Sequence, residues 1–194
     1  ENLLSVDDRF SMLNILTSKI SGKELEKQMK NIWRLAYAFG RSYQVRYSWP
    51  ERLSLSGTPL NESLVALHTI LPKFQKENKL QKVQCIVLTD GEANQLSYHT
   101  EIKTGRSEPY IGNRRCDCEC TLLRDRKLGT TYKFGWGYHE FTKTMLRNLK
   151  DKFPQVNFIG IRVIEGRNIN GFIKLFYSSY NEITKLQQDW RKTR

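Results

Sequence analysis

The sequence predicts an α/β fold in which helices cover both faces of a Rossmann-like, doubly wound sheet. Residues 82–90 form a strand-like run, and both alternating faces of its segment from Cys85 to Leu88 are apolar. A second apolar run spans residues 156–164. Amphipathic helical segments precede, separate and follow these two runs. Strands that are apolar on both faces are typical of a parallel sheet covered by helices on both sides. Such sheets bind ligands at the carboxyl ends of their strands.

Length and composition fit one globular domain. The chain has 194 residues, of which 39% are hydrophobic, and its formal net charge is +12. This charge favours acidic partners such as nucleic acid, an anionic surface or an acidic protein. The basic residues are spread along the chain without a nucleic-acid-binding signature, so nucleic-acid binding stays an alternative function. No apolar run reaches the roughly 20 residues of a membrane span, and no export signal is recognisable.

The amino-terminal third predicts two helices. Residues 7–17 carry apolar side chains at helical spacing, namely Phe10, Leu13 and Leu16. In the next helix Ser21 can cap the start and Gly40 can stop it. Its apolar stripe consists of Leu25, Met29, Ile32, Trp33 and Ala36. Residues 41–54 are polar and aromatic and predict a loop with room for an extended piece.

A third helix follows residues 54–61, which predict a loop. Pro59 suits the first helical turn, and apolar side chains then recur on one face: Leu60, Leu64, Leu67, Leu71 and Phe74. Because proline lacks an N–H and its ring clashes with the preceding turn, we expect a kink or an early end at Pro72.

An excursion is expected between the two strands, over about residues 92–137. Within it, residues 121–124 and 130–134 flank a turn and predict a β-hairpin. A helix should then end near Phe153, since apolar side chains recur at Phe141, Met145, Leu146 and Leu149. After the second strand, the remainder is expected to be helical, with one face formed by Phe172, Leu175 and Phe176.

Two short motifs carry the functional prediction. One is Ser56-Gly57-Thr58-Pro59-Leu60-Asn61 before a helix, and the other is Ile86-Val87-Leu88-Thr89-Asp90-Gly91-Glu92 at a strand end. In this order, separated by one helix, they resemble the second and third metal loops of von Willebrand factor A (VWA) domains. The resemblance implies a metal-ion-dependent adhesion site (MIDAS) with Thr58 as hydroxyl ligand and Asp90 as carboxylate. Supporting residues would be Ser56, Gly57, Gly91 and Glu92.

The chemistry of these residues suits a hard divalent cation. Mg²⁺ takes about six oxygen ligands and keeps several waters, so a few hydroxyls and carboxylates at strand ends leave a position open. A partner's carboxylate can fill that position. Gly57 and Gly91 let the backbone turn tightly beside the ion. The expected cofactor is therefore Mg²⁺ or Mn²⁺, and the expected partner is a protein that supplies an acidic ligand. Alternatively, Thr58 caps a helix and Asp90 forms a turn.

One part of the VWA pattern is missing from the sequence. No Asp-x-Ser-x-Ser occurs, and the string that starts at Asp7 lacks the serine spacing. We therefore expect residues 1–194 to be a single truncated VWA-type domain, whose first strand and first metal loop lie upstream of Glu1.

The resemblance narrows to VWA proteins of large tailed bacteriophages. Its motifs run from the Trp33 helix through Thr58 and Asp90 to Leu123-Arg124-Asp125-Arg126 before Tyr132. These proteins, often labelled peptidases, are similar to the VWA subunit of cobalt chelatases, which works beside a ring-shaped AAA+ ATPase. The resemblance thus implies an AAA+ partner. Because the cysteines do not resemble a secreted disulfide framework, we expect a cytoplasmic location, which is the host cytoplasm if the protein is phage-encoded.

Peptidase activity is the third candidate function, after metal-dependent protein binding and nucleic-acid binding, and no residue pattern supports it. The sequence has neither a His-Glu-x-x-His helix nor a Gly-x-Ser-x-Gly elbow. His68, His99 and His139 are scattered, and no phosphate-binding glycine-rich loop with Lys-Ser/Thr is present. We therefore expect a binding protein without a catalytic constellation.

The cysteines suggest a possible second metal site. Cys116, Cys118 and Cys120 are spaced by two, so in an extended chain their thiols share one face and could bind Zn²⁺. A fourth ligand, such as His99 or His139, would be needed. The alternative is a reduced, exposed edge beside the hairpin.

Overall fold

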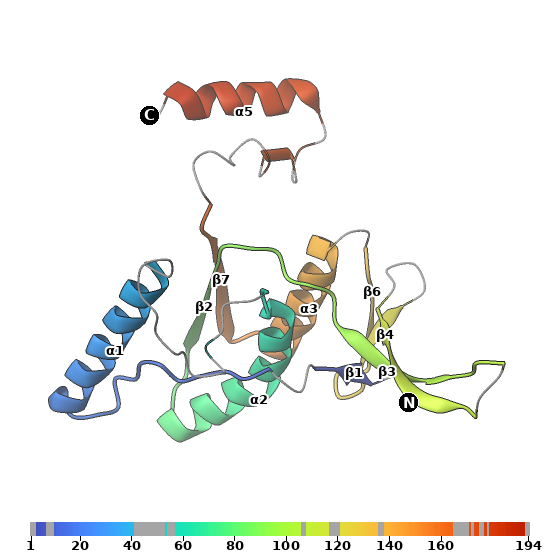
Figure 1. Cartoon of the computed structure of the whole chain (residues 1–194), viewed down its shortest axis with the longest axis horizontal. Coiled ribbons are helices and arrows are strands. Elements are labelled where there is room, and N and C mark those ends of the chain that lie inside the picture. The colour runs from blue at the N-terminus through green and yellow to red at the C-terminus, as the bar shows by residue number, and fades with distance from the viewer. Residues whose placement is uncertain are drawn as a thin grey trace.

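The protein is a mixed α/β structure (Figure 1). The computed structural model describes residues 3–6, 10–40, 53, 57–105, 108–116, 121–135, 138–164, 171, 173–174, 177 and 179–192. Its helices and strands, in chain order, are β1 (Leu4–Ser5), α1 (Gly22–Gly40), α2 (Leu60–Asn78), β2 (Val83–Thr89), β3 (Ser97–Ile102), β4 (Tyr110–Arg115), β5 (Leu122–Asp125), β6 (Thr130–Lys133), α3 (Tyr138–Lys152), β7 (Val156–Arg162) and α5 (Tyr180–Lys192).

The two predicted strands are confirmed as a parallel pair. β2 and β7 are in register from Val83 opposite Val156 to Thr89 opposite Arg162. Their inner face contributes Val83 and Val156 to the core beside α2 and α3. The outer face is apolar but uncovered, with Leu88 67% exposed. Within the described residues, helices therefore cover one face of this sheet and not both.

The outcome for the amino-terminal helices is mixed. α1 begins at Gly22, where the Ser21 Oγ accepts a hydrogen bond from the Glu24 N–H at 3.3 Å, and it ends at Gly40 as predicted. Its apolar stripe remains largely exposed, with Trp33 at 66%. The helix expected over residues 7–17 is wrong for residues 10–17, which contain no helix. Leu13 and Leu16 remain 46% and 47% exposed, so their packing adds too little to stabilise a helix there.

The expected early end of the third helix is also wrong. α2 continues through Pro72 to Asn78. Buried Leu64, Leu67 and Leu71 hold the helix against the core before the proline, and this packing outweighs the lost hydrogen bond. The helix ends instead at Asn78, and Lys79 follows in the left-handed conformation with a φ of 52°. There the N–H groups of Lys79 and Leu80 donate to the Lys76 and Gln75 carbonyls.

Two hairpins follow β2, and one of them was predicted. β5 and β6 pair antiparallel from Leu122 opposite Lys133 to Asp125 opposite Thr130, which confirms the hairpin in the excursion. β3 and β4 form the other, and β1 extends it into a three-stranded sheet of order β1-β3-β4. This sheet was missed because the sequences of β3 and β4 are largely polar and lack an apolar alternation.

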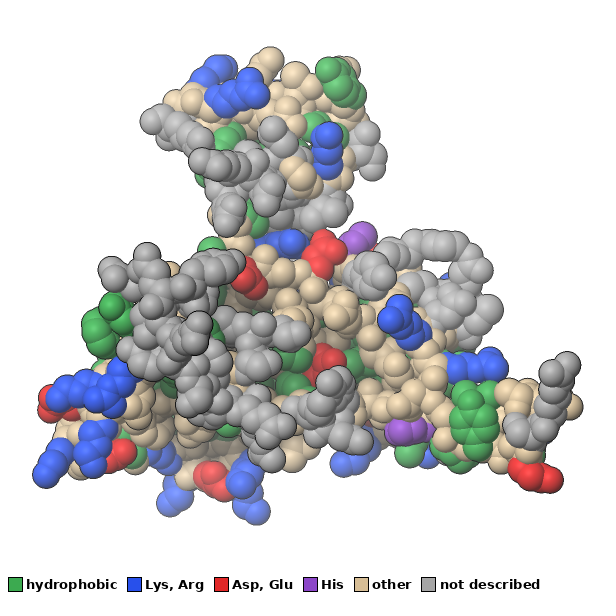
Figure 2. Space-filling view, in the orientation of Figure 1, with side chains coloured by type: hydrophobic (Ala, Val, Ile, Leu, Met, Phe, Trp, Pro, Cys, Tyr) green, Lys and Arg blue, Asp and Glu red, His purple; other side chains and the backbone are tan. Residues whose placement is uncertain are grey.

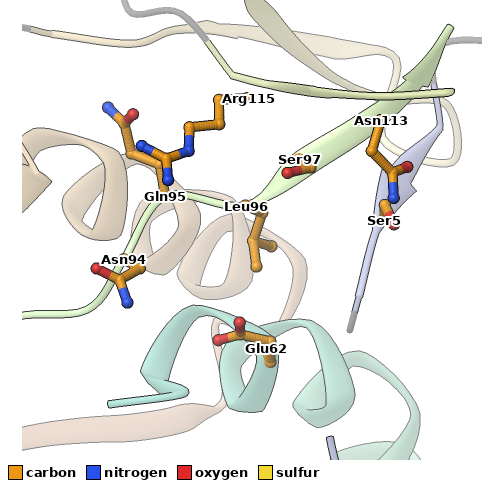
Figure 3. Close-up of a pocket in the computed structure, with 8 residues that line it drawn as sticks. All are labelled: Ser5, Glu62, Asn94, Gln95, Leu96, Ser97, Asn113 and Arg115. Carbon is orange, nitrogen blue, oxygen red and sulfur yellow. The ribbon is translucent and has the colours of Figure 1, made fainter. Parts of the chain in front are cut away.

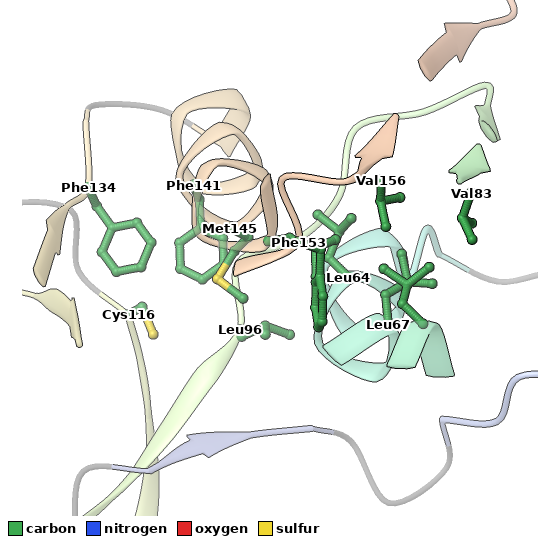
Figure 4. Close-up of a cluster of buried hydrophobic side chains, with 12 residues drawn as sticks. Leu64, Leu67, Val83, Leu96, Cys116, Phe134, Phe141, Met145, Phe153 and Val156 are labelled. Carbon is green, nitrogen blue, oxygen red and sulfur yellow. The ribbon is translucent and has the colours of Figure 1, made fainter. Parts of the chain in front are cut away.

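The core lies between α2, α3 and the inner face of the parallel pair (Figure 4). The most completely buried apolar side chains belong to α3, where Phe141 and Leu149 are 0% exposed and Met145 is 2% exposed. Phe141 stacks on Phe134 at a centroid distance of 4.5 Å. α3, predicted from this spacing, is therefore the helix on which the core is built, and it is confirmed over Tyr138–Lys152.

Candidate functional site

The loop before α2 meets the carboxyl end of β2. A Cβ built at Gly91 would lie 2.8 Å from the Thr58 Oγ1, closer than real Cβ contacts allow. The Thr58 hydroxyl therefore lies directly against Gly91, next to Asp90. Gly57, with a φ of 77°, adopts the left-handed conformation just before Thr58. The two loops that the sequence motifs identified are thus neighbours in the fold.

The end of β2 is held in a tight turn. The Thr89 Oγ1 accepts a hydrogen bond from the Gly91 N–H at 3.3 Å and donates one to the Gly91 carbonyl at 3.1 Å. The Val163 N–H donates to the Thr89 carbonyl at 2.8 Å, which ties the end of β7 to the same place. Asp90 is exposed at this turn, and no ion pair within the described ranges engages it.

Arg162 is a neighbour of this site that sequence reasoning missed. It is the last residue of β7, and its Nη1 lies 3.5 Å from the Glu92 Oε1. The guanidinium pairs with Glu92, whereas no ion pair within the described residues engages Asp90. A charged residue inside the otherwise apolar run 156–164 was the available signal.

The residues present match part of a divalent-cation site. The Thr58 hydroxyl and the Asp90 carboxylate are hard oxygen donors of the kind Mg²⁺ and Mn²⁺ prefer. In the part of the chain that the structure describes, no three His, Cys, Asp or Glu side chains form a group that could hold a metal. Ser56 lies outside the described residues. Any further ligands must therefore be water, a partner or residues other than these.

The cysteine cluster is described only at its first member. Cys116 is 1% exposed and belongs to the hydrophobic core, as Figure 4 shows, and its N–H donates to the Leu96 carbonyl at 3.0 Å. Cys118 and Cys120 lie outside the described residues. Of the candidate fourth ligands, His99 is exposed on β3 and His139 lies 3.7 Å from Glu140. The burial of Cys116 favours packing over a solvent-accessible metal ligand.

A buried polar cluster around Asp125 was not foreseen either. The Asp125 side chain, 7% exposed, accepts hydrogen bonds from the Asn148 Nδ2 and the Lys152 Nζ, both at 3.0 Å. It also accepts the backbone N–H groups of Lys127 and Leu128 at 2.9 and 3.1 Å. Burial opposes ionisation, but these hydrogen bonds outweigh it and hold the pKa of Asp125 well below its ordinary value. The cluster fastens the β5–β6 hairpin to α3.

Further contacts strengthen this link. The Tyr132 Oη donates to the Asp151 Oδ2 at 2.9 Å, and burial raises the pKa of Tyr132. His68 of α2 lies against Phe153 at a ring distance of 5.9 Å. Burial and the nearby Lys152 charge lower the pKa of His68, against the opposing effect of Asp125. Together these contacts join the β5–β6 hairpin and α2 to the carboxyl-terminal end of α3.

The basic surface is dispersed. On the face in Figure 2, Lys and Arg side chains lie over several elements. On α1 they alternate with carboxylates, as in the pair of Lys30 and Glu26 at 2.7 Å. The Lys and Arg side chains on this face are therefore dispersed and define no groove for nucleic acid.

None of the described helices is both long and apolar enough to cross a membrane.

Comparisons with known proteins found no match to this chain among protein-family models, curated proteins or solved structures.

Proposed function

We propose that this chain is part of a VWA-type, metal-dependent protein–protein interaction module, with Thr58 and Asp90 as two ligands of one Mg²⁺ or Mn²⁺. The observation that carries the proposal is the placement of the Thr58 hydroxyl against Gly91. Residues 58 and 91 are separated by a helix and a strand, so their contact is a property of the fold. It sets the Thr58 hydroxyl beside the residue that follows Asp90, which supports a shared MIDAS-type site.

The role of each residue follows from its chemistry. Thr58 offers a neutral oxygen donor and Asp90 a charged one, either directly or through water. Gly91 allows the two loops to approach closely, Gly57 supplies the left-handed conformation before Thr58, and Arg162 pairs with Glu92. The cation, when bound, supplies a positive charge to which a carboxylate of the partner can coordinate. The proposed module acts by binding its partner.

The doubly wound fold is part of the same proposal. The uncovered outer face of β2 and β7 carries aliphatic side chains in register, among them Ile86 opposite Ile159 and Leu88 opposite Ile161. Parallel strands are normally buried on both faces. In the proposed fold, helices would cover this face too, and the Asp-x-Ser-x-Ser ligands would come from a neighbouring strand.

The proposed partner is an AAA+ ATPase or a client that it processes. This follows from the resemblance to the phage and chelatase VWA proteins, in which the VWA module works beside such a motor. A metal-completed site suits this task because its affinity can be tuned by one acidic side chain of the partner.

Cation binding by the chain itself tests the ligand assignment. We expect Mn²⁺ to bind with a dissociation constant on the order of millimolar, because the described residues supply few charged ligands. Asp90→Asn keeps the shape and removes the charge, so it should weaken Mn²⁺ binding about tenfold, equivalent to roughly 1.4 kcal/mol. The measurement is a Mn²⁺ titration followed by electron paramagnetic resonance, with competition by Mg²⁺.

Asp189→Asn is the matched control. Asp189 is an exposed carboxylate on α5, 3.7 Å from Lys192, and has no part in the proposed site. Its substitution should leave Mn²⁺ affinity unchanged. If the two substitutions weaken Mn²⁺ binding equally, or neither does, the cation is held by diffuse negative charge and the assignment is wrong.

A further inference from the structure

A polar pocket lies between the first turn of α2 and the β1-β3-β4 sheet (Figure 3). Its volume is about 360 Å³, and its lining comes from four separate segments of the chain. Polar side chains dominate that lining, among them Ser5, Glu62, Asn94, Ser97, Asn113 and Arg115. Ligand pockets start at about 300 Å³, so the space suits a small molecule.

The pocket carries one charge of each sign. Glu62 enters it from α2 and Arg115 from β4, and Figure 3 shows these two side chains on either side of Leu96. Within the described part of the chain, no ion pair engages Arg115. A ligand with one cationic and one anionic end would match this arrangement.

One carboxylate oxygen of Glu62 accepts no hydrogen bond from the described residues. This oxygen, Oε2, is buried. The Glu62 carboxylate therefore lines the pocket with no cationic partner among the described residues. An ammonium group is the ligand feature that would pair with it most strongly.

The polar wall beside Glu62 is fixed in place. Asn61, which is 0% exposed, donates from its Nδ2 to the Asn94 carbonyl at 2.6 Å. This bond joins α2 to the segment that leads into β3. The side-chain amides of Asn94 and Asn113 both face the pocket, where they can pair with the amide of a short peptide.

We propose that this pocket binds a small zwitterion of amino-acid or dipeptide size. The ammonium group lies at Glu62, the carboxylate at Arg115, and the polar middle contacts Asn94 and Asn113. The proposal rests on the pocket alone and does not depend on cation binding at Thr58 and Asp90.

Nuclear magnetic resonance tests it with glycylglycine as the probe. We expect saturable shifts of the Asn94 and Asn113 side-chain amide signals, with a dissociation constant on the order of millimolar. N-acetylglycinamide, which lacks both charges, should cause no saturable shift. Absence of saturation with glycylglycine, or equal shifts with the uncharged compound, would overturn the proposal.

Substitutions locate the binding. Glu62→Gln and Arg115→Gln should each weaken glycylglycine binding at least tenfold, while the remaining amide signals confirm that the fold is kept. The matched controls are Glu77→Gln, further along α2, and Arg114→Gln, on the opposite face of β4. Neither control should alter the affinity. Equal losses in the controls would show general charge attraction and contradict the assigned pocket.

Discussion

Replacing Asp125 with alanine should lower the free energy of unfolding by about 3 kcal/mol. The side chain is 7% exposed and accepts hydrogen bonds from Asn148, Lys152 and two backbone N–H groups. Its removal leaves the Lys152 ammonium without its carboxylate at a position only 21% exposed. This residual exposure places the loss at the lower end of the range for a broken buried pair. Denaturant unfolding measures it.

The same carboxylate should make stability depend on pH. Its pKa in the folded protein lies below the value of about 3.9 in an unfolded chain. The folded state therefore binds the proton less readily, and Asp125 stabilises the fold above the unfolded pKa. This contribution is lost as the pH falls below about 4 toward the folded pKa. Unfolding curves recorded between neutral pH and acid should show less pH dependence for Asp125→Asn than for the wild type.

Asp189→Asn serves again as the control, because Asp189 is an exposed carboxylate whose ion pair with Lys192 stabilises little. It should change neither the stability nor its pH dependence appreciably. If Asp125→Ala has the same free energy of unfolding as the wild type, the hairpin is not fastened to α3 through this carboxylate.

Phe141→Ala should cost about 3–5 kcal/mol of unfolding free energy. Phe141 is 0% exposed and stacks on Phe134 at 4.5 Å, between the hairpin and α3. Truncation removes buried apolar area, loses the stacking contact and leaves a cavity that the neighbouring helix cannot fill completely. Thermal and denaturant unfolding both report the change.

Phe74→Ala is the matched control, since Phe74 is 46% exposed on α2. Its truncation should cost roughly 1 kcal/mol or less, because much of the ring already contacts water. Comparable losses at the two positions would contradict the placement of the core on α3.

The elements that could be predicted from the sequence are those specified by a local pattern of apolar, turn or capping residues. The apolar run through Cys85 and Leu88 specifies β2, and the turn between residues 124 and 130 specifies the β5–β6 hairpin. Ser21 and Gly40 mark the ends of α1. In each case the information lies within a few neighbouring residues.

The errors arise where tertiary packing decides. Residues 10–17 have helical spacing but leave Leu13 and Leu16 nearly half exposed, whereas α2 passes Pro72 because Leu71 and its neighbours are buried. β3 and β4 are polar strands that exist because they pair with each other. Sequence pattern describes an isolated segment, and it cannot weigh the contacts that the segment makes in the fold.

The site follows the same division. Thr58 and Asp90 could be proposed from the sequence because each belongs to a short motif. Arg162 was not, because its pairing with Glu92 joins the ends of two strands far apart in sequence. Asp125 receives hydrogen bonds from residues 23 and 27 positions away, and no local pattern announces them.

The most direct test of the shared site is the coupling free energy between Thr58→Ala and Gly91→Ala in a double-mutant cycle. In the wild type, a Cβ at Gly91 meets the Thr58 Oγ1 at 2.8 Å, so Gly91→Ala should destabilise the protein by about 1 kcal/mol or more. With Thr58→Ala, the nearest remaining atom is the Thr58 Cβ at 3.8 Å, an ordinary contact, so Gly91→Ala should become nearly neutral.

Gly160→Ala, whose added Cβ meets nothing within 4 Å, should show no coupling to Thr58→Ala. A coupling free energy of about 1 kcal/mol for positions 58 and 91 is the result expected if the two loops form one site. Additive effects within roughly 0.5 kcal/mol would show that Thr58 does not lie against the end of β2, and the proposed cation site would be lost with that contact.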